Sequence, residues 1–369
     1  MRPAYSVLYS FKGGSEDGED PLAGLINVKG TLYGTTQNGG VHCTARGGCG
    51  TVFTVTTSGG ETLLHRFKRK NGAYPSAGLL NVNGTLYGTT TMGGAGYGTV
   101  FAITKSAKEP LLYSFPSGEG DGAYPSAGLI NVNGRLYGTT QFGGAGYHGT
   151  VFAITTSGKE RVLYSFPSDQ RDGEAPFAGL IDVNGTLYGT TEGGGANDEG
   201  TVFAITPSGT ETVLHSFKDS SADGEHPRAG LINVNGTLYG TTYAGGANCS
   251  SSDYCGTVFA ITLSGKETVL HSFPSGSGDG SSPEAGLINI KGTLYGTTEF
   301  GGTCSGSIGC GTVFAITTSG GETVLHKFAN YPSDGGYPSA GLINIEGTLY
   351  GTTAEGGAYD DGTVFSLSP

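Results

Sequence analysis

The chain has 369 residues, of which 70 are Gly and none is Trp, and charged residues make up only 14%. Its formal net charge of −12 at pH 7 opposes binding to nucleic acids and to anionic membrane surfaces, which attract concentrated basic patches. No apolar stretch approaches the roughly 18 residues that a membrane-spanning helix needs. No signal peptide precedes the first strand-like segment, so an exported form would have lost its leader.

The first predicted element is a lone strand over residues 5–11. Six four-strand units then follow along the chain, and a seventh unit ends after its third strand. Every unit contains Leu-Tyr-Gly-Thr-Thr and, after a loop, Gly-Thr-Val-Phe. In the fourth unit, Asn184-Gly185 and Ser208-Gly209 predict tight turns, because Asn-Gly tolerates the positive φ angles of a hairpin. The strands predicted in this unit are 178–183, 186–191, 200–206 and 212–217.

A repeat of about 50 residues with four strands is typical of a propeller blade, because sheets packed around an axis bury their faces against one another. The chain opens with a fourth strand and ends with a third strand, so the two pieces complement each other. We therefore predict an all-β fold: a seven-bladed β-propeller of four-stranded antiparallel blades, closed by residues 5–11 in the last blade. The predicted single domain covers residues 1–369, with blades at approximately 23–67, 77–115, 127–166, 178–217, 229–273, 285–328, and 340–368 plus 5–11.

The repeated pattern resembles a known family at these motifs. Leu-Tyr-Gly-Thr-Thr, a Gly-Gly loop, Gly-Thr-Val-Phe-Ala-Ile and Leu-His-Ser-Phe are similar to the GloVer (Gloeo/Verruco) repeat, which occurs in tandem in large secreted or surface-anchored bacterial proteins. The resemblance covers nearly the whole chain. It implies a propeller and an extracellular location, and it transfers no catalytic residue.

The six cysteines lie only in the three longest loops between second and third strands, and each pair has five intervening residues. Closing such a short loop removes unfolded-state entropy worth roughly 2 kcal/mol, whereas the spacing does not fit a zinc site. We expect three local disulfides and hence an extracytoplasmic location, which is the periplasm, the cell surface or the medium. The predicted pairs are Cys43–Cys49, Cys249–Cys255 and Cys304–Cys310.

Every long loop is expected on one face of the ring, and loops on a rigid scaffold are where binding residues usually lie. On this face, aromatic rings could stack on sugars or peptide side chains, and carboxylates and amides could bind hydroxyl groups. The alternative is that these residues only pack and solvate the loops. The predicted ligand-binding residues are Gln37, Tyr97, Gln141, Phe142, Tyr147, His148, Phe177, Glu192, Arg228, Tyr243, Glu299 and Phe300.

Catalysis at the same face is the competing hypothesis. Glu192 and Glu299 are candidates for a glycosidase-type carboxylate pair, and Tyr147, His148 or Arg228 for the base and the charge neutraliser of a polysaccharide lyase. Neither a Gly-x-Ser-x-Gly elbow nor a His-Glu-x-x-His motif occurs in the sequence.

The repeated His and Asp residues are expected to be structural. His65, His215, His271 and His326 share one strand-four position with three tyrosines, and an Asp before Gly recurs in the loop that enters each of six blades, where it favours an Asx turn. Asp198, Asp360 and Asp361 are weak calcium candidates, without an EF-hand pattern.

The leading hypothesis from the sequence is a non-catalytic extracellular binding or scaffold propeller that holds a glycan or a protein, without a cofactor. It predicts no nucleic-acid partner and no membrane insertion, and a monomeric domain that could belong to a larger anchored protein. The alternatives are a carbohydrate-active enzyme and a purely structural surface repeat.

Overall fold

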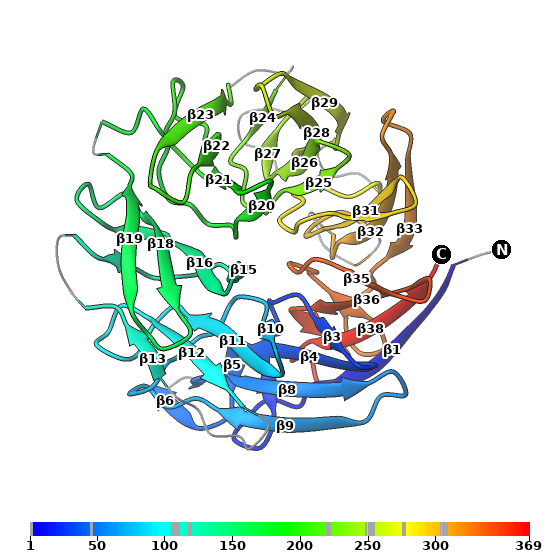
Figure 1. Ribbon diagram of the computed structural model, residues 1–369. Coiled ribbons are helices and arrows are strands. Elements are labelled where there is room, and N and C mark those ends of the chain that lie inside the picture. Colours follow the sequence, from blue (N-terminus) through cyan, green and yellow to red (C-terminus); the bar gives the residue numbers. More distant parts are fainter. Residues whose placement is uncertain are drawn as a thin grey trace.

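The computed structural model describes residues 3–44, 47–104, 111–116, 120–167, 169–218, 223–247, 249, 255–274, 278–302, 304 and 309–369, with the backbone alone for 42–44. These residues form seven four-stranded antiparallel sheets around a central axis, and no helix occurs among them (Figure 1). None of them belongs to a helix of the length and apolarity that crossing a membrane requires. The predicted seven-bladed β-propeller is confirmed.

The first four blades follow one another in chain order, each running from the axis outward. Blade one contains β3 (Ile26–Val28), β4 (Thr31–Thr36), β8 (Thr51–Thr56) and β9 (Glu61–Arg66). Blade two contains β10 (Leu80–Val82), β11 (Thr85–Thr90), β12 (Thr99–Ile103) and β13 (Leu111–Ser114). Blade three contains β15 (Ile130–Val132), β16 (Arg135–Thr140), β18 (Thr150–Thr155) and β19 (Glu160–Ser165). Blade four contains β20 (Ile181–Val183), β21 (Thr186–Thr191), β22 (Thr201–Ile205) and β23 (Glu211–Ser216).

The remaining blades repeat this order, and the last one takes its outer strand from the start of the chain. Blade five contains β25 (Ile232–Val234), β26 (Thr237–Thr242), β28 (Thr257–Thr262) and β29 (Glu267–Ser272). Blade six contains β30 (Ile288–Ile290), β31 (Thr293–Thr298), β32 (Thr312–Thr317) and β33 (Glu322–Lys327). Blade seven contains β35 (Ile343–Ile345), β36 (Thr348–Thr353), β38 (Thr363–Ser368) and β1 (Ala4–Ser10).

The ring closes as the incomplete ends of the sequence predict. β1 pairs antiparallel with β38, with Tyr5 opposite Leu367 and Val7 opposite Phe365. The two ends of the chain consequently lie side by side (Figure 1). Pairing removes two strand edges that would otherwise be open.

The innermost strands are shorter than the sequence predicts. In blade four the strand begins at Ile181 rather than at Ala178, because residues 178–180 line the axis. The Thr139 hydroxyl of blade three donates to the Ala178 carbonyl at 2.9 Å, and a Cβ on Gly179 would meet the Gly128 carbonyl oxygen at 3.2 Å. The same two contacts join every neighbouring pair of blades around the ring.

The Leu-Tyr-Gly-Thr-Thr motif makes contacts between strands of its own blade and a hydrogen bond to the next blade. In blade four Leu187 is fully buried, and a Cβ on Gly189 would meet the Phe203 ring at 2.7 Å. Thr190 donates to the Ala229 carbonyl of blade five at 3.0 Å, and the Thr191 hydroxyl lies 2.8 Å from the Thr201 hydroxyl. Each position of the motif therefore has a separate packing or hydrogen-bonding role.

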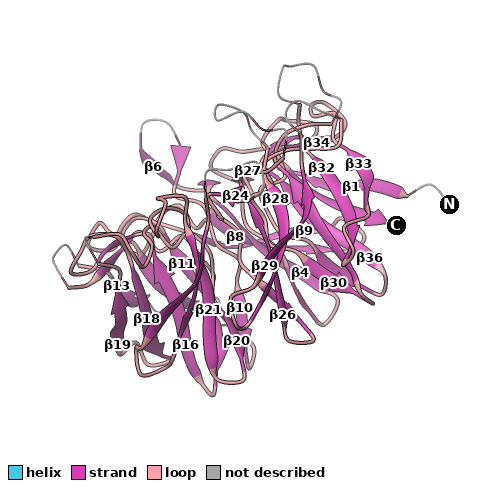
Figure 2. Cartoon of the chain, turned by 90° about the horizontal axis from the view of Figure 1, so that it is seen from above, coloured by secondary structure: helices cyan, strands magenta, loops and turns pink. Residues whose placement is uncertain are grey.

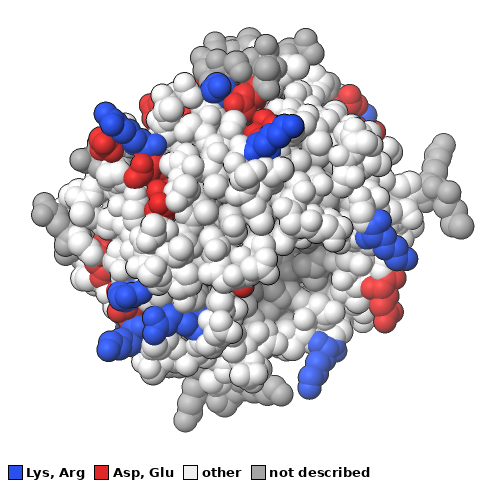
Figure 3. Space-filling model, turned by 45° about the horizontal axis from the view of Figure 1, so that its top comes forward, with Lys and Arg blue, Asp and Glu red and all other residues white. Residues whose placement is uncertain are grey.

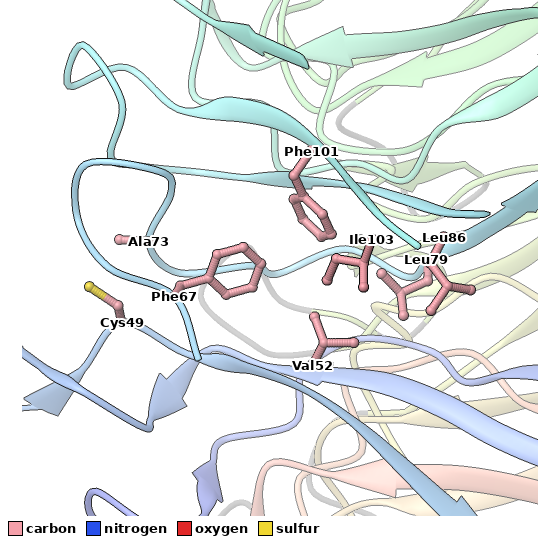
Figure 4. Packing of buried hydrophobic residues seen from close by; sticks show 8 residues of the cluster. All are labelled: Cys49, Val52, Phe67, Ala73, Leu79, Leu86, Phe101 and Ile103. Carbon is pink, nitrogen blue, oxygen red and sulfur yellow. The ribbon is translucent and has the colours of Figure 1, made fainter. Parts of the chain in front are cut away.

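The hydrophobic core lies between blades. In the cluster of Figure 4, Val52 and Phe67 of blade one pack against Leu86 and Phe101 of blade two. The rings of Phe67 and Phe101 are 4.9 Å apart in an edge-to-face arrangement, which aromatic pairs favour. The equivalent Phe pair occurs at each of the seven blade junctions.

Replacing Thr190 with Val is expected to lower the free energy of unfolding by about 1–3 kcal/mol, because the hydroxyl bound to the next blade is lost at a buried site. The control is Thr212→Val on the exposed face of β23, where a change within about 0.5 kcal/mol is expected. Denaturant unfolding of the two variants measures the difference. Equal effects would show that the inter-blade bond does not stabilise the ring.

The two faces of the ring are unequal. Hairpin turns such as that between β20 and β21 project from one face, and the long connections, including β6 (His42–Thr44), project from the other, the loop face (Figure 2). Two-residue ladders, which the sequence analysis did not predict, hold these long connections together. They are β2 (Gly18–Glu19) with β5 (Asn38–Gly39), β14 (Gly122–Ala123) with β17 (Phe142–Gly143), β24 (Gly224–Glu225) with β27 (Ala244–Gly245), β34 (Gly335–Gly336) with β37 (Glu355–Gly356), and β6 with β7 (Gly47–Gly48).

Candidate functional site

The axial channel is lined by Gly, Leu and Ile residues, whose side chains carry no polar group. It is a cavity of about 390 Å³ lined by the Gly-Leu-Ile or Gly-Leu-Leu residues that open the innermost strand of every blade, such as Gly179, Leu180 and Ile181. None of its lining residues is titratable. Recognition of a polar ligand therefore requires the side chains of the loop face.

An aromatic pocket of about 340 Å³ lies at the boundary of blades two and three. Its rings are Tyr97, Tyr124, Phe142 and Tyr147. The backbone N–H of Tyr124 donates to the Tyr97 carbonyl at 2.8 Å, and the ladder of β14 with β17 places Phe142 opposite Ala123. Backbone hydrogen bonds between blades thus fix three of the four rings relative to one another, and the exposed fractions of Phe142 and Tyr147 are 49% and 54%.

A second pocket, of about 370 Å³, shares Phe142 with the first and is lined by acids and histidines. His148 Nδ1 lies 2.5 Å from Glu174 Oε2, and the Gln170 amide donates to the same oxygen at 2.7 Å. Glu192 and His226 line the far side of the pocket. The two pockets adjoin at Phe142, and we refer to them together as the loop-face groove, whose lining residues extend from Tyr97 in blade two to His226 at the start of blade five.

A charged cluster follows at the end of the groove. Arg228 Nη2 lies 2.8 Å from Glu192 Oε1, and Arg228 Nη1 lies 3.7 Å from Glu284 Oε1. The Arg228 guanidinium stacks 3.9 Å from the centre of the Tyr243 ring. One cation thus bridges carboxylates from two blades and contacts an aromatic face, an arrangement that favours Arg over Lys.

Burial raises the pKa of Glu299 to about 7, and the neighbouring charge of Glu284 adds to the rise, while Arg228 and Tyr243 oppose it. Burial also raises the pKa of Glu284. Near neutral pH Glu299 is consequently a mixture of acid and carboxylate, whereas Glu192 is bound to Arg228. The two glutamates predicted as a catalytic pair lie around the same guanidinium but in different environments.

The other predicted ligand-binding residues lie around the same face without joining the groove. Gln37 donates its amide to the Ser76 hydroxyl at 3.0 Å, the Gln141 N–H donates to the Tyr124 carbonyl, and the Phe177 carbonyl accepts from Ser126. Phe300 packs edge-to-face with Tyr337 at 6.1 Å.

Sequence reasoning missed Tyr124 and Glu174 as members of the site. Each lies within two residues of the repeated Pro that precedes the innermost strand. Glu19 and Glu225 take the place of Glu174, and Tyr74 and Tyr337 that of Tyr124, in other blades, so no departure from the repeat marks either residue.

Two of the three predicted disulfides are confirmed. Cys249–Cys255 and Cys304–Cys310 have Cα–Cα distances of 6.0 and 5.7 Å. Cys49 is disulfide-bonded, but the side chain of Cys43 lies outside the described residues, so the pairing Cys43–Cys49 stays a prediction.

Two of the three calcium candidates accept backbone hydrogen bonds within their own loops. Asp198 and Asp360 accept the N–H of Gly194 and Gly356, four residues earlier, at 3.2 and 3.1 Å. Burial and the charges of Asp20 and Asp360 raise the pKa of Asp361. Among the described residues, the groups with suitable ligand atoms within 4.8 Å of one another are Glu199 with Glu225 and His226, and His215 with Asp223 and Glu267.

The second of these groups belongs to a structural repeat at the outer blade junctions. His215 Nε2 lies 3.3 Å from Asp223 Oδ2, and in another blade the Tyr9 hydroxyl donates to Asp17 Oδ2 at 2.7 Å in the same way. The Asp17 carboxylate also accepts the N–H of Gly18. Because Tyr takes the place of His, the arrangement does not depend on a metal ligand, in agreement with the structural role expected for these histidines.

Glutamates from the next blade complete these junctions, and we refer to them as the junction glutamates. They are the first residues of β9, β19, β23, β29 and β33. Burial raises their pKa, and the Asp of the preceding blade adds to the rise. The values are about 7 for Glu61, Glu160, Glu267 and Glu322 and about 8 for Glu211.

Surface charge elsewhere is dispersed. In the view of Figure 3, Lys and Arg side chains are separated by a mostly uncharged surface instead of forming one basic region.

Similarity to solved structures supports the fold. A protein of Bacteroides uniformis named as a 6-phosphogluconolactonase has a TM-score of 0.52 and 13% identity, with 85% of this chain and 86% of that chain covered. A puromycin hydrolase has a TM-score of 0.53 and 11% identity, with 95% of this chain and 53% of that chain covered. At such identities the likeness concerns the propeller fold alone. No curated protein sequence is significantly similar to this chain.

The sequence profile of the Gloeobacter/Verrucomicrobia repeat matches residues 2–120, 44–254 and 249–369. These segments overlap and together extend from the first blade to the last. The chain therefore belongs to the Gloeobacter/Verrucomicrobia repeat family.

Proposed function

We propose that the chain is a non-catalytic binding propeller that holds a glycan in the loop-face groove. The observation that carries this proposal is the junction of two pockets, of about 340 and 370 Å³, at Phe142. One pocket offers aromatic rings for the apolar faces of sugars, and the other offers carboxylates and imidazoles for hydroxyl groups.

Binding is favoured over catalysis because the candidate catalytic groups are engaged with each other. His148 is paired with Glu174, and Arg228 is paired with Glu192 and Glu284. As a charge neutraliser, Arg228 would have to leave these glutamates before it could bind a carboxylate of the substrate. An extracellular protein ligand is the other partner class expected from the sequence, and it would have to use the same exposed rings.

The disulfides support a location outside the cytoplasm, where such bonds persist. We infer a periplasmic, surface-bound or secreted protein. Separating the host cell into fractions, followed by thiol labelling of the protein in each, tests this location. Reduced Cys249 and Cys304 in a protein confined to the cytoplasm would contradict it.

The double variant Phe142→Ala, Tyr147→Asn is expected to lose at least about tenfold in affinity for any glycan that the wild type retains on an array, because two exposed ring contacts are removed. Both new residues suit the local backbone, since Ala244 takes the place of Phe142 in blade five and Asn tolerates positive φ. The control is Tyr359→Ala, whose ring is equally exposed at 54%. Equal losses in both variants, or a wild type that binds no glycan, would contradict the proposal.

The second candidate function is a glycoside hydrolase or lyase at the mouth of the channel. The observation that favours it is Glu299, whose pKa of about 7 suits a general acid. Release of new reducing ends or of unsaturated uronic acids from polysaccharides, lost in Glu299→Gln, would establish this activity in place of simple binding.

A further inference from the structure

Three of the four rings of the aromatic pocket meet at steep angles. The planes of Tyr97 and Tyr124 meet at 61°, with ring centres 5.7 Å apart, and those of Tyr124 and Phe142 meet at 87°, with centres 6.0 Å apart. The exposed Phe142 and Tyr147 rings can each stack on a sugar ring, and walls set at steep angles also enclose a compact group on more than one side. Aromatic walls of this kind are the recognised environment for an ammonium group, which the negative faces of the rings attract.

The fourth ring is held in a conformation that its residue type disfavours. Tyr147 has φ of 62°, and the equivalent positions of blades four and seven have Asp198 with φ of 68° and Asp360 with φ of 66°. Both Asp side chains accept a backbone N–H within the loop, and Asp tolerates this conformation. A Tyr ring does not replace that bond, and Tyr74, Tyr124 and Tyr337 also have positive φ. What distinguishes Tyr147 from the Asp of the other two blades is the wall that it gives to the pocket.

The electrostatic surroundings of the pocket are negative. Neither pocket of the groove has a Lys or an Arg among its lining residues, while Glu174, Glu192 and Asp198 line the pocket next to the aromatic one. Arg228, the cation beyond them, is paired with two glutamates. With a formal net charge of −12 on the chain, a ligand that carries positive charge is attracted to this face.

We propose that the aromatic pocket binds an ammonium group carried by the glycan, so that the ligand is an oligosaccharide containing amino sugars with free amines. This inference rests on the proposed function and specifies its ligand class. The rings of Tyr97, Tyr124, Phe142 and Tyr147 enclose the ammonium group, and the carboxylates of the adjoining pocket attract the neighbouring charged units.

The test compares three hexasaccharides that share a β-1,4-linked backbone and differ at carbon 2: the glucosamine hexamer, its fully N-acetylated form and cellohexaose. Calorimetry at pH 6 is expected to show at least tenfold tighter binding of the glucosamine hexamer than of the two neutral ones. Phe142→Ala and Tyr147→Asn should each abolish that preference, and Tyr359→Ala should retain it. Choline chloride should compete with the hexamer more strongly than NaCl at equal ionic strength.

Each other outcome overturns the inference in a distinguishable way. Equal binding of all three hexasaccharides, without competition by choline, would leave glycan binding intact and remove the ammonium site. Binding of oligolysine but of no hexasaccharide would assign the pocket to a basic protein segment. Loss of affinity in Tyr359→Ala equal to that in Tyr147→Asn would show that removal of any exposed ring weakens binding, so that the pocket is not the specific site.

Discussion

A chain that lacks residues 1–11 is expected to lose cooperative folding. The deletion removes β1 and exposes the whole edge of β38, to which residues from Ala4 to Ser10 are paired. It also removes Phe11, which is fully buried and whose ring lies 4.9 Å from that of Phe53 in blade one. Loss of such a Phe side chain alone costs about 3–5 kcal/mol, a large part of the stability of an ordinary domain.

Thermal unfolding followed by circular dichroism measures this effect, and the control is deletion of residues 1–3, which precede β1. A synthetic peptide with the sequence of residues 4–11 is expected to restore the unfolding transition of the shortened chain, since it can pair with β38 again. A shortened chain with an unchanged melting temperature would mean that the ring does not need this strand for its closure.

Stability is expected to be highest near pH 5 and to fall as the pH rises toward 8.5. The junction glutamates have pKa values of about 7 to 8 in the folded protein, above the ordinary value of 4.5, because they are partly buried beside an Asp of the preceding blade. The folded state therefore binds more protons than the unfolded state. Their contribution is complete below pH 4.5 and is lost as the pH rises through the folded values.

Each junction glutamate contributes on the order of 1 kcal/mol after allowance for its partial exposure to solvent. Ionisation of all the junction glutamates together is expected to lower the melting temperature by roughly 5 °C or more between pH 5 and 8.5. The lowered pKa of His271 has the opposite effect on stability, since the stabilisation by neutral His271 is present above pH 6.5 and is lost at lower pH. Because His271 is a single group, the effect of the several junction glutamates is expected to be larger.

The triple variant Glu160→Gln, Glu211→Gln, Glu267→Gln is expected to flatten this pH dependence, because Gln imitates the protonated form at every pH. Melting temperatures of the wild type and the variant across the range give the comparison. The control is Glu16→Gln, at a glutamate whose side chain is 90% exposed. If the wild type were most stable at pH 8.5, the junction glutamates would not take up protons on folding.

The propeller scaffold could be predicted from the sequence because the residues that form its turns and strands recur at fixed positions in every repeat. The turn at Asn184-Gly185, the paired threonines of the repeat and the complementary ends at Val7 and Phe365 are visible as pattern. The groove could be predicted only as a set of candidates, since the distance between Tyr97 and Tyr124, or between Arg228 and its two glutamates, depends on how neighbouring blades are rotated. The two-residue ladders recur at the Asp-Gly and Gly-Gly positions of the repeat, but they are formed by backbone groups of loops, so no alternation of apolar residues marks them.

The short ladders have a consequence for how the loop face can vary. In blade three the ladder of β14 with β17 closes the base of the connection that carries Tyr147 and His148, and in blades five and six disulfides close the corresponding segment. What lies beyond each base can be exchanged without disturbing the sheets beneath. A chain of this design offers up to seven independent cassettes, so that a new specificity could be grafted onto one blade while its neighbours keep theirs.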